Sequence, residues 1–151
     1  MRRAPQETRT YFATFVTAQR RSIFQVTATA ELMLNHLQEQ RRKGRIELYA
    51  FVIMPDHLHI MLTPGHDISL EKSIQYIKGG FSFLLKSKLD VWERSYNEVQ
   101  ITTPDHFEST RNYIETNPVR AHLASAPCAY RYSSAGRPDL VDAAPPWLSQ
   151  G

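Results

Sequence analysis

The chain has 151 residues, of which 42% are hydrophobic and 22% are charged, and its formal net charge is +3. These values are typical of one globular domain rather than a disordered chain, and the small basic excess fits a polyanionic partner without requiring one. Cys128 is the only cysteine, which excludes an internal disulfide framework and a cysteine-rich zinc module, and without a signal peptide or a run of about 18 apolar residues we expect a cytoplasmic protein with no membrane contact.

Strands and helices are predicted to alternate between a flexible basic arm at residues 1–9 and a mostly irregular tail at residues 126–151, which is rich in Ala, Pro and Ser. Period-2 patterns predict strands and period-3.6 patterns predict helices. The predicted strands cover residues 10–17, 46–54, 57–63 and 91–101. The predicted helices cover residues 26–43, 69–89 and 104–116, and Pro118 is expected to end the last one.

The order of these elements, β-α-β-β-α-β followed by one more helix, predicts an α+β fold. The first six elements match the ferredoxin-like arrangement, in which an antiparallel four-stranded sheet carries two helices on one face. The C-terminal helix is additional, and it contains Tyr113.

Two histidines, His57 and His59, stand one residue apart just after the turn predicted at Pro55-Asp56. Alternate residues of a strand point to the same face, so both imidazoles face away from the side on which Leu58 meets the core. Neutral imidazoles at this spacing can bind one divalent ion. Many such pairs bind nothing, however, and two ligands do not complete a site. The pattern therefore allows a metal site that needs a third ligand from elsewhere in the chain.

Tyr113 and Asn117 are four residues apart and share one face of the last predicted helix. An amide oxygen is a suitable ligand for Mg²⁺ or Mn²⁺, and a tyrosine hydroxyl can act as a nucleophile where a cation stabilises the charge that it attacks. The competing interpretation makes Tyr113 an aromatic packing residue beside Phe107 and Ile114, with Asn117 as a helix cap ahead of Pro118.

Taken together and in this order, the histidine pair and the tyrosine helix resemble those of the single-tyrosine HUH transposases. Within the IS200-like group of these enzymes, the segment YAFVIMPDHLHIML at residues 49–62 is similar to the REP-associated tyrosine transposases, where REP denotes a repetitive extragenic palindrome. Similar segments also occur at residues 92–96, 117–120 and 130–134. The resemblance covers about residues 11 to 134 and predicts a transposase domain at residues 10–125.

The resemblance implies that His57 and His59 bind a divalent metal, Mg²⁺ or Mn²⁺, with Asn117 as the third ligand, where relatives often have glutamine. It also implies that Tyr113 attacks a DNA phosphodiester and forms a 5′-phosphotyrosine linkage, which a 3′-hydroxyl later attacks to reseal the strand. The expected activity is metal-dependent cleavage and strand transfer on single-stranded, palindromic hairpin DNA during transposition. The family includes both monomers and homodimers, so the resemblance leaves the oligomeric state open.

DNA binding requires cations for the phosphates and aromatic rings for the bases. The basic run at residues 41–45 is one candidate, and Gly79-Gly80 beside Lys78 would let the backbone approach a phosphate closely. For each cation, the competing interpretation is a solvated side chain on an exposed helix face. Alternation predicts one strand face for residues 92, 94 and 96, whose side chains either pack beneath the site or stack on a base. The residues expected to contact DNA are Lys78, Lys86, Trp92, Arg94, Tyr96 and Arg120.

Two other functions compete with the transposase hypothesis. A non-catalytic module that binds single-stranded nucleic acid on a ferredoxin-like sheet would have the same fold, but it would need neither the histidine pair nor Tyr113. A relaxase or a replication initiator would use the same chemistry, although such enzymes are usually larger and often place the tyrosine differently. A covalent protein–DNA adduct that depends on Tyr113 would separate an enzyme from a binding module.

Overall fold

A computed structural model describes residues 8–150, so most of the predicted N-terminal arm lies outside the described residues. Its centre is an antiparallel four-stranded sheet with the strand order β2-β3-β1-β4, which is the ferredoxin-like order and confirms the predicted fold class. The strands are β1 (Thr10–Val16), β2 (Ile46–Met54), β3 (His57–Pro64) and β4 (Asn97–Ile101). The helices are α1 (Thr27–Arg42), α2 (Leu70–Leu85) and α3 (Pro104–Arg120).

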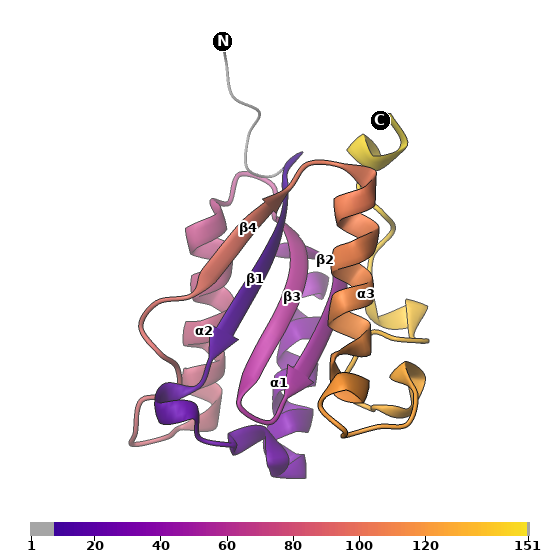
Figure 1. Cartoon of the computed structure of the whole chain (residues 1–151). Coiled ribbons are helices and arrows are strands. Elements are labelled where there is room, and N and C mark those ends of the chain that lie inside the picture. Colours follow the sequence, from indigo (N-terminus) through magenta and orange to yellow (C-terminus); the bar gives the residue numbers. More distant parts are fainter. Residues whose placement is uncertain (1–7, 151) are drawn as a thin grey trace.

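The helices lie on both faces of the sheet (Figure 1). Helices α1 and α2 cover one face, where Leu58, Ile60 and Leu62 of β3 belong to the larger hydrophobic core. Helix α3 packs on the β2 and β3 side of the other face, where Met61 contributes to a smaller core with Phe107. The alternation expected for β3 is therefore observed, and its two histidines are on the α3 face, opposite the larger core.

Three predicted boundaries were wrong. Helix α2 ends at Leu85 because Lys86 has a left-handed backbone, with φ of 55°, and its N–H closes the helix on the Ser82 carbonyl. The strand predicted over residues 91–101 begins only at Asn97. The apolar and polar side chains that alternate just before β4 have another cause. Trp92 is buried against aromatic residues of the larger core and makes only an isolated bridge to the end of β1.

The third correction concerns Pro118, which does not end α3, because the helix continues to Arg120. A proline inside a helix removes one backbone hydrogen bond and crowds the preceding turn. The missing hydrogen bond belongs to the last turn of α3, and the Pro118 ring is buried. Burial of this apolar ring offsets the missing hydrogen bond and keeps Asn117 in helical geometry, one turn after Tyr113.

The glycine pair at residues 79–80 has a packing role. A β-carbon on Gly80 would lie 2.7 Å from Cε1 of His36, whose Nε2 lies 3.1 Å and 3.0 Å from the carbonyl oxygens of Tyr76 and Ile77. Gly80 therefore allows the close contact of α1 with α2 that these hydrogen bonds require. Gly79 is exposed, and a β-carbon there would meet nothing nearer than Gln75 at 4.0 Å.

These two glycines form a matched pair for a stability measurement. Gly79→Ala is expected to stabilise the protein by up to about 1 kcal/mol, because alanine has the higher helix propensity. Gly80→Ala is expected to destabilise it by about 1 to 3 kcal/mol, because the methyl group displaces the buried His36 ring from its hydrogen bonds. Urea unfolding of both variants measures the difference, and equal stabilities would refute the packing role of Gly80.

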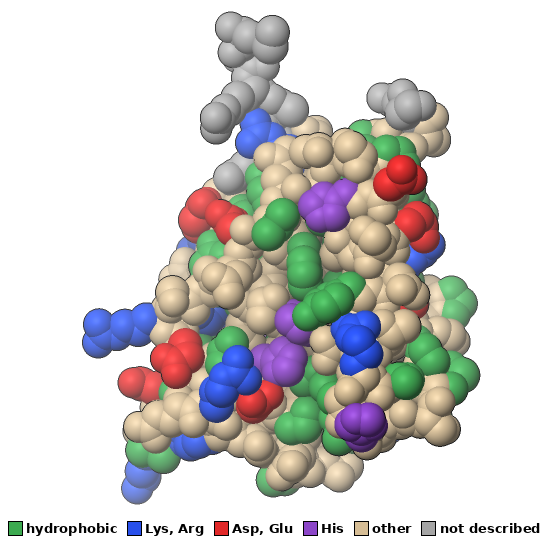
Figure 2. Space-filling model, viewed as in Figure 1, with side chains coloured by type: hydrophobic (Ala, Val, Ile, Leu, Met, Phe, Trp, Pro, Cys, Tyr) green, Lys and Arg blue, Asp and Glu red, His purple; other side chains and the backbone are tan. Residues whose placement is uncertain are grey.

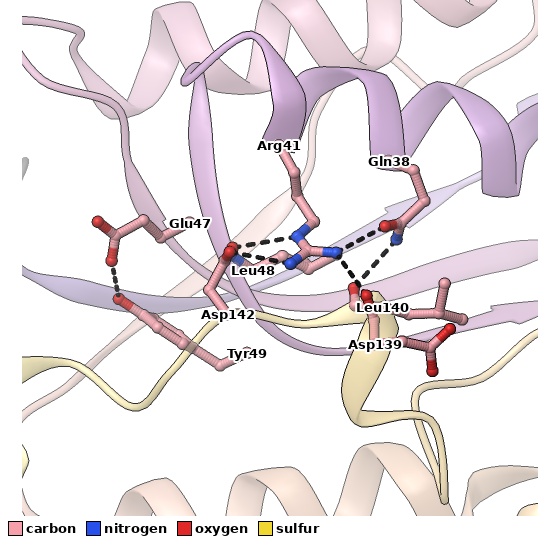
Figure 3. Close-up of polar contacts among 8 residues, drawn as sticks. All are labelled: Gln38, Arg41, Glu47, Leu48, Tyr49, Asp139, Leu140 and Asp142. Atoms are coloured by element: carbon pink, nitrogen blue, oxygen red, sulfur yellow. Dashed lines mark hydrogen bonds and ion pairs between the residues drawn. The ribbon is translucent and has the colours of Figure 1, made fainter.

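As far as residue 150, the C-terminal tail contains only short 3₁₀ helices, but it follows the outer edge of β2 through backbone hydrogen bonds. Asp142 attaches the tail to β2 most tightly. Its N–H donates to the Leu48 carbonyl at 2.7 Å, and its carboxylate accepts the Leu48 N–H at 2.7 Å (Figure 3). Arg41 of α1 binds both oxygens of the same carboxylate, at 3.0 Å and 3.2 Å. Arg41, part of the basic run proposed for DNA, is thus engaged in holding the tail.

Candidate active site

The two histidines of the sequence motif lie side by side on the α3 face of the sheet. β3 begins at His57, directly after the turn at Pro55-Asp56, so both rings stand near the start of the strand. The ring centroids of His57 and His59 are 4.7 Å apart, and the rings meet edge to face. Figure 2 shows histidine side chains in the middle of this face, beside hydrophobic and basic groups.

Each of these rings has a polar partner on its Nδ1 atom. Nδ1 of His57 lies 2.7 Å from a carboxylate oxygen of Asp56, and Nδ1 of His59 lies 2.8 Å from the hydroxyl of Thr14. His59 is only 7% exposed, and burial, followed by the nearby charges of His57 and Arg120, lowers its pKa to about 3. His59 is therefore neutral at physiological pH, which is the state in which imidazole binds metal ions.

Helix α3 places Tyr113 next to this pair. The helix starts with Thr103 as its N-cap and Pro104 in its first turn, and its buried side chains face β2 and β3. Tyr113 lies beside that apolar stripe and remains 46% exposed. The centroid of its ring is 5.7 Å from that of His59 and 6.0 Å from that of Phe12 on β1. The fold thus brings together residues that are more than fifty positions apart in the sequence.

Asn117 and Arg120 follow Tyr113 on α3. Asn117 is half-buried, and its side-chain amide makes no hydrogen bond within residues 8–150. The Arg120 guanidinium lies 4.4 Å from the centre of the Tyr113 ring, donates to the Tyr113 carbonyl at 2.8 Å and also binds the hydroxyl of Thr116. The helix therefore presents a phenol and a permanent cation near the histidine pair, with an amide one turn after the phenol.

The site brings together the imidazole rings of the histidine pair and the Asp56 carboxylate bonded to one of them, and α3 adds the amide of Asn117 one turn after Tyr113. In the described part of the chain, no three His, Cys, Asp or Glu side chains form a group that could hold a metal ion. The set of His57, His59 and Asn117 has nitrogen and amide-oxygen donors with no net charge, and a phosphate oxygen could complete it. Such donors suit Mg²⁺ or Mn²⁺ when an anionic ligand is also bound.

A model of the family described as "Transposase IS200 like" matches residues 6–117 of the chain. The chain belongs to the IS200-like transposase family. Among solved structures, a REP-associated tyrosine transposase bound to a REP hairpin is similar to it, with a TM-score of 0.77 and 22% identity over 95% of this chain and 90% of that one. The expected family is thereby confirmed, and the resemblance to the REP-associated type is confirmed in the fold.

A second solved structure, that of a candidate transposase from Deinococcus radiodurans R1, matches with a TM-score of 0.52 and 20% identity, over 76% of this chain and 92% of that one. A comparison with curated proteins gave no match. Within residues 8–150, this IS200-like transposase has no helix of the length and apolar character that a membrane span requires.

Beside the histidines, the IS200-like transposase has a hollow of about 340 Å³ over the part of the sheet that α3 leaves open. Val99 of β4, on the same sheet face, is 50% exposed. The hollow adjoins the site, because Thr14 is both in its wall and bonded to His59. It is lined by Thr14, Val16, Arg20, Glu93, Ser95, Tyr96 and Asn97.

The residues predicted to contact DNA occupy different environments. Tyr96 lines the hollow, and the Lys78 ammonium lies 5.5 Å from the centre of its ring and donates to the Glu93 carbonyl. Burial lowers the pKa of Lys78. Arg94 and Lys86 are exposed. Arg120 lies at Tyr113, as described above, so these cations are spread around the site rather than gathered in one patch.

Trp92 differs from the other predicted DNA contacts. Its side chain is buried, with 8% of the residue exposed, and its indole N–H donates to the Lys78 carbonyl at 3.1 Å. Its ring packs against Phe24 and Phe81 in the larger core. The predicted strand face is wrong because residues 92–96 form no strand, although Trp92 and Tyr96 both pack on Phe15. A base has no access to the Trp92 ring in the structure.

Sequence reasoning missed the side chains that hold the histidines. Asp56 was assigned only to the turn, and Thr14 was not singled out, although both bond to histidine Nδ1 atoms. Arg20 was also missed, and it pairs with Asp56 at 3.0 Å. A usable signal existed for Asp56, which directly precedes His57. The Thr14 contact depends on the register of β1 against β3, where Thr14 is opposite His59.

Proposed function

We propose that this IS200-like transposase cleaves and rejoins single-stranded DNA through a covalent 5′-phosphotyrosine intermediate, with Tyr113 as the nucleophile. The observation that carries the proposal is the position of the half-exposed Tyr113 ring, 5.7 Å from the ring of His59 and thus beside the histidine pair. A phenol in a packing role would have been buried with Phe107 and Ile114, which are 1% and 0% exposed.

We infer that His57, His59 and Asn117 hold one divalent metal ion, Mg²⁺ or Mn²⁺. The neutral state of the buried His59 and the free amide of Asn117 fit this role. When bound, such an ion draws charge from the oxygens of a phosphate and so makes the phosphorus more open to attack.

The side chains on α3 carry out the strand exchange. The Tyr113 oxygen attacks the phosphorus, the bond from phosphorus to the 3′-oxygen breaks, and the phenol proton is balanced by the one that the new 3′-hydroxyl takes up. Arg120 keeps a positive charge over the Tyr113 ring, within the field that acts on the phosphate. In the reverse direction a 3′-hydroxyl attacks the phosphotyrosine, which conserves the energy of the bond, so no nucleotide cofactor is needed.

The DNA strand is proposed to cross the open half of the sheet, over β1 and β4, to reach Tyr113. The hollow beside the histidines offers Tyr96 for base stacking, with Lys78 and Arg94 nearby for phosphates. Lys86 at the end of α2 is a further candidate. A palindromic hairpin is the proposed substrate because the similar REP-associated transposase was solved with a REP hairpin. A homodimer and a monomer both remain compatible with this path.

The proposal is tested by incubating the full chain with a labelled single-stranded hairpin of REP type and Mn²⁺. The expected product is a protein–DNA adduct that survives denaturation, and its yield should fall to background when EDTA removes the metal and return when Mn²⁺ is restored. Asp139, whose ion pair with Arg137 lies exposed in the tail, provides the control: Asp139→Ala should leave the yield unchanged. No adduct with any hairpin, or an adduct that forms equally well in EDTA, would contradict the proposal.

A further inference from the structure

Both candidate metal-binding histidines have the same ring nitrogen already engaged by the protein. Asp56 occupies Nδ1 of His57, and Thr14 occupies Nδ1 of His59. We propose that Asp56, supported by Arg20, and Thr14 are positioning residues that hold both imidazoles with Nε2 free to bind one divalent cation. The inference rests on the function proposed above and assigns a role to residues that the reaction itself does not use.

The Asp56 carboxylate determines which nitrogen of His57 carries the proton. A carboxylate only accepts hydrogen bonds, so at 2.7 Å from Nδ1 it requires a hydrogen there. In the neutral ring, Nε2 is then left with its lone pair exposed, which is the form that a metal ion needs. The same contact fixes the orientation of the ring, because Asp56 is the residue directly before His57 and both lie at the tight junction between β2 and β3.

Thr14 performs the corresponding task for His59 from another strand. The two residues are opposite each other in the β1–β3 pairing, and the hydroxyl oxygen lies 2.8 Å from Nδ1. A hydroxyl can donate or accept, so it adapts to the ring: when Nε2 binds a cation, Nδ1 carries the hydrogen and donates it to Thr14. His59 is buried at this contact, so the ring has little freedom to turn Nδ1 outward.

A strained turn brings Arg20 to Asp56. Gln19 and Arg20 have positive φ values of 56° and 51°, a backbone conformation that is unfavourable for residues other than glycine. The turn is fixed on both sides, because the Thr17 N–H donates to the Asp56 carbonyl at 3.0 Å and the Gln19 N–H donates to Glu93 at 3.0 Å.

The result of this turn is that the Arg20 guanidinium lies 3.0 Å from the second oxygen of Asp56. The Arg20 side chain is 66% exposed, so the ion pair itself adds little stability. Its effect is geometric. One carboxylate oxygen is held by Arg20 and the other faces His57, so the ion pair favours the orientation in which the carboxylate meets the ring.

The test measures Mn²⁺ binding to the full chain by calorimetry and by the electron paramagnetic resonance signal of the free ion. Asp56→Ala and Thr14→Val are expected to weaken binding by about 10- to 100-fold, the usual effect of removing the partner of a metal-bound histidine. Asp56→Asn and Thr14→Ser keep an oxygen for the Nδ1–H and should restore most of the affinity. Asp139→Ala, which removes an exposed ion pair with Arg137, should bind Mn²⁺ like the wild type.

A second measurement needs no metal and no variant that could fail to fold. Nitrogen-15 spectra of the neutral histidine rings in the wild type should show His57 with hydrogen on Nδ1. Hydrogen on Nε2 of the neutral His57 ring would overturn the proposal, as would folded Asp56→Ala and Thr14→Val variants that bind Mn²⁺ with wild-type affinity.

These outcomes separate the inference from the function on which it rests. If the wild type binds Mn²⁺ and the Asp56 and Thr14 variants bind it equally well, only the positioning role fails. If the wild type binds no Mn²⁺, the proposed metal site fails and the positioning role fails with it. If the variants lose Mn²⁺ affinity as expected but no DNA adduct ever forms, the positioning role stands and the strand-transfer function fails.

Discussion

Tyr113→Phe is expected to abolish the covalent protein–DNA adduct, with a loss of at least about a thousandfold, the scale on which nucleophile removal acts in enzymes that form covalent intermediates. The change removes one oxygen atom from a half-exposed side chain. The ring that remains keeps its contacts with Phe12, His59 and Arg120, so folding and DNA affinity should hardly change. The loss would therefore report on chemistry rather than on structure.

The adduct is measured on denaturing gels with a labelled hairpin and Mn²⁺, and DNA affinity is measured on the same samples by a filter or mobility assay. Tyr76→Phe is the matched control, because Tyr76 lies on α2, away from the histidines, where Arg45 covers its ring at 3.9 Å. It should form the adduct in full yield. Undiminished yield in Tyr113→Phe would assign the nucleophile to another residue, and the non-catalytic binding module would be favoured if neither protein formed an adduct.

Asp142→Ala is expected to lower the free energy of unfolding by about 2 to 4 kcal/mol, which makes it the largest single-residue effect on stability predicted outside the apolar core. The side chain accepts from the backbone of Leu48 and from Arg41, whose side chain is 19% exposed and would lose its carboxylate partner. Asp142 itself is 31% exposed, so solvent screens part of the charge and keeps the effect below that of a fully buried pair.

Denaturant unfolding measures this change, and hydrogen exchange at the Leu48 amide locates it. Asp142→Asn, which keeps one oxygen acceptor, should fall between the wild type and the alanine variant. Asp139→Ala serves as the control in the same tail, because its ion pair with Arg137 is exposed and its loss should have a negligible effect. Equal stability of the Asp142 and Asp139 variants would mean that the tail is not held by this carboxylate.

Much of the fold could be predicted because its signals are local. The period-2 pattern of residues 57–63 already separates the face of Leu58 from the face of the histidines, and the structure keeps that division. Prediction failed where distant packing overrides the local pattern. Residues 91–96 alternate like a strand, yet Trp92 is drawn into the core by Phe24 and Phe81, and the burial of Pro118 carries α3 past the residue expected to end it.

The candidate site likewise contains some residues that the sequence reveals and others that it does not. The spacing of His57 and His59 within one strand, and of Tyr113 and Asn117 within one helix, is visible in the sequence because each pair shares one element. Two of the residues that hold the site are not visible in the sequence, since Thr14 reaches His59 only through strand register, and Arg20 reaches Asp56 only through a turn with positive φ angles. No local pattern encodes either contact.

The attachment of the tail to β2 has a consequence for how the chain folds. The bonds from Asp142 reach back 94 residues to Leu48 and 101 residues to Arg41, so they close some of the longest loops in the molecule. Contacts of such separation form late, and until they form the outer edge of β2 has unpaired backbone groups that can recruit a strand from another chain. Refolding yield should therefore fall with rising protein concentration, and it should fall more steeply for Asp142→Ala than for the native sequence.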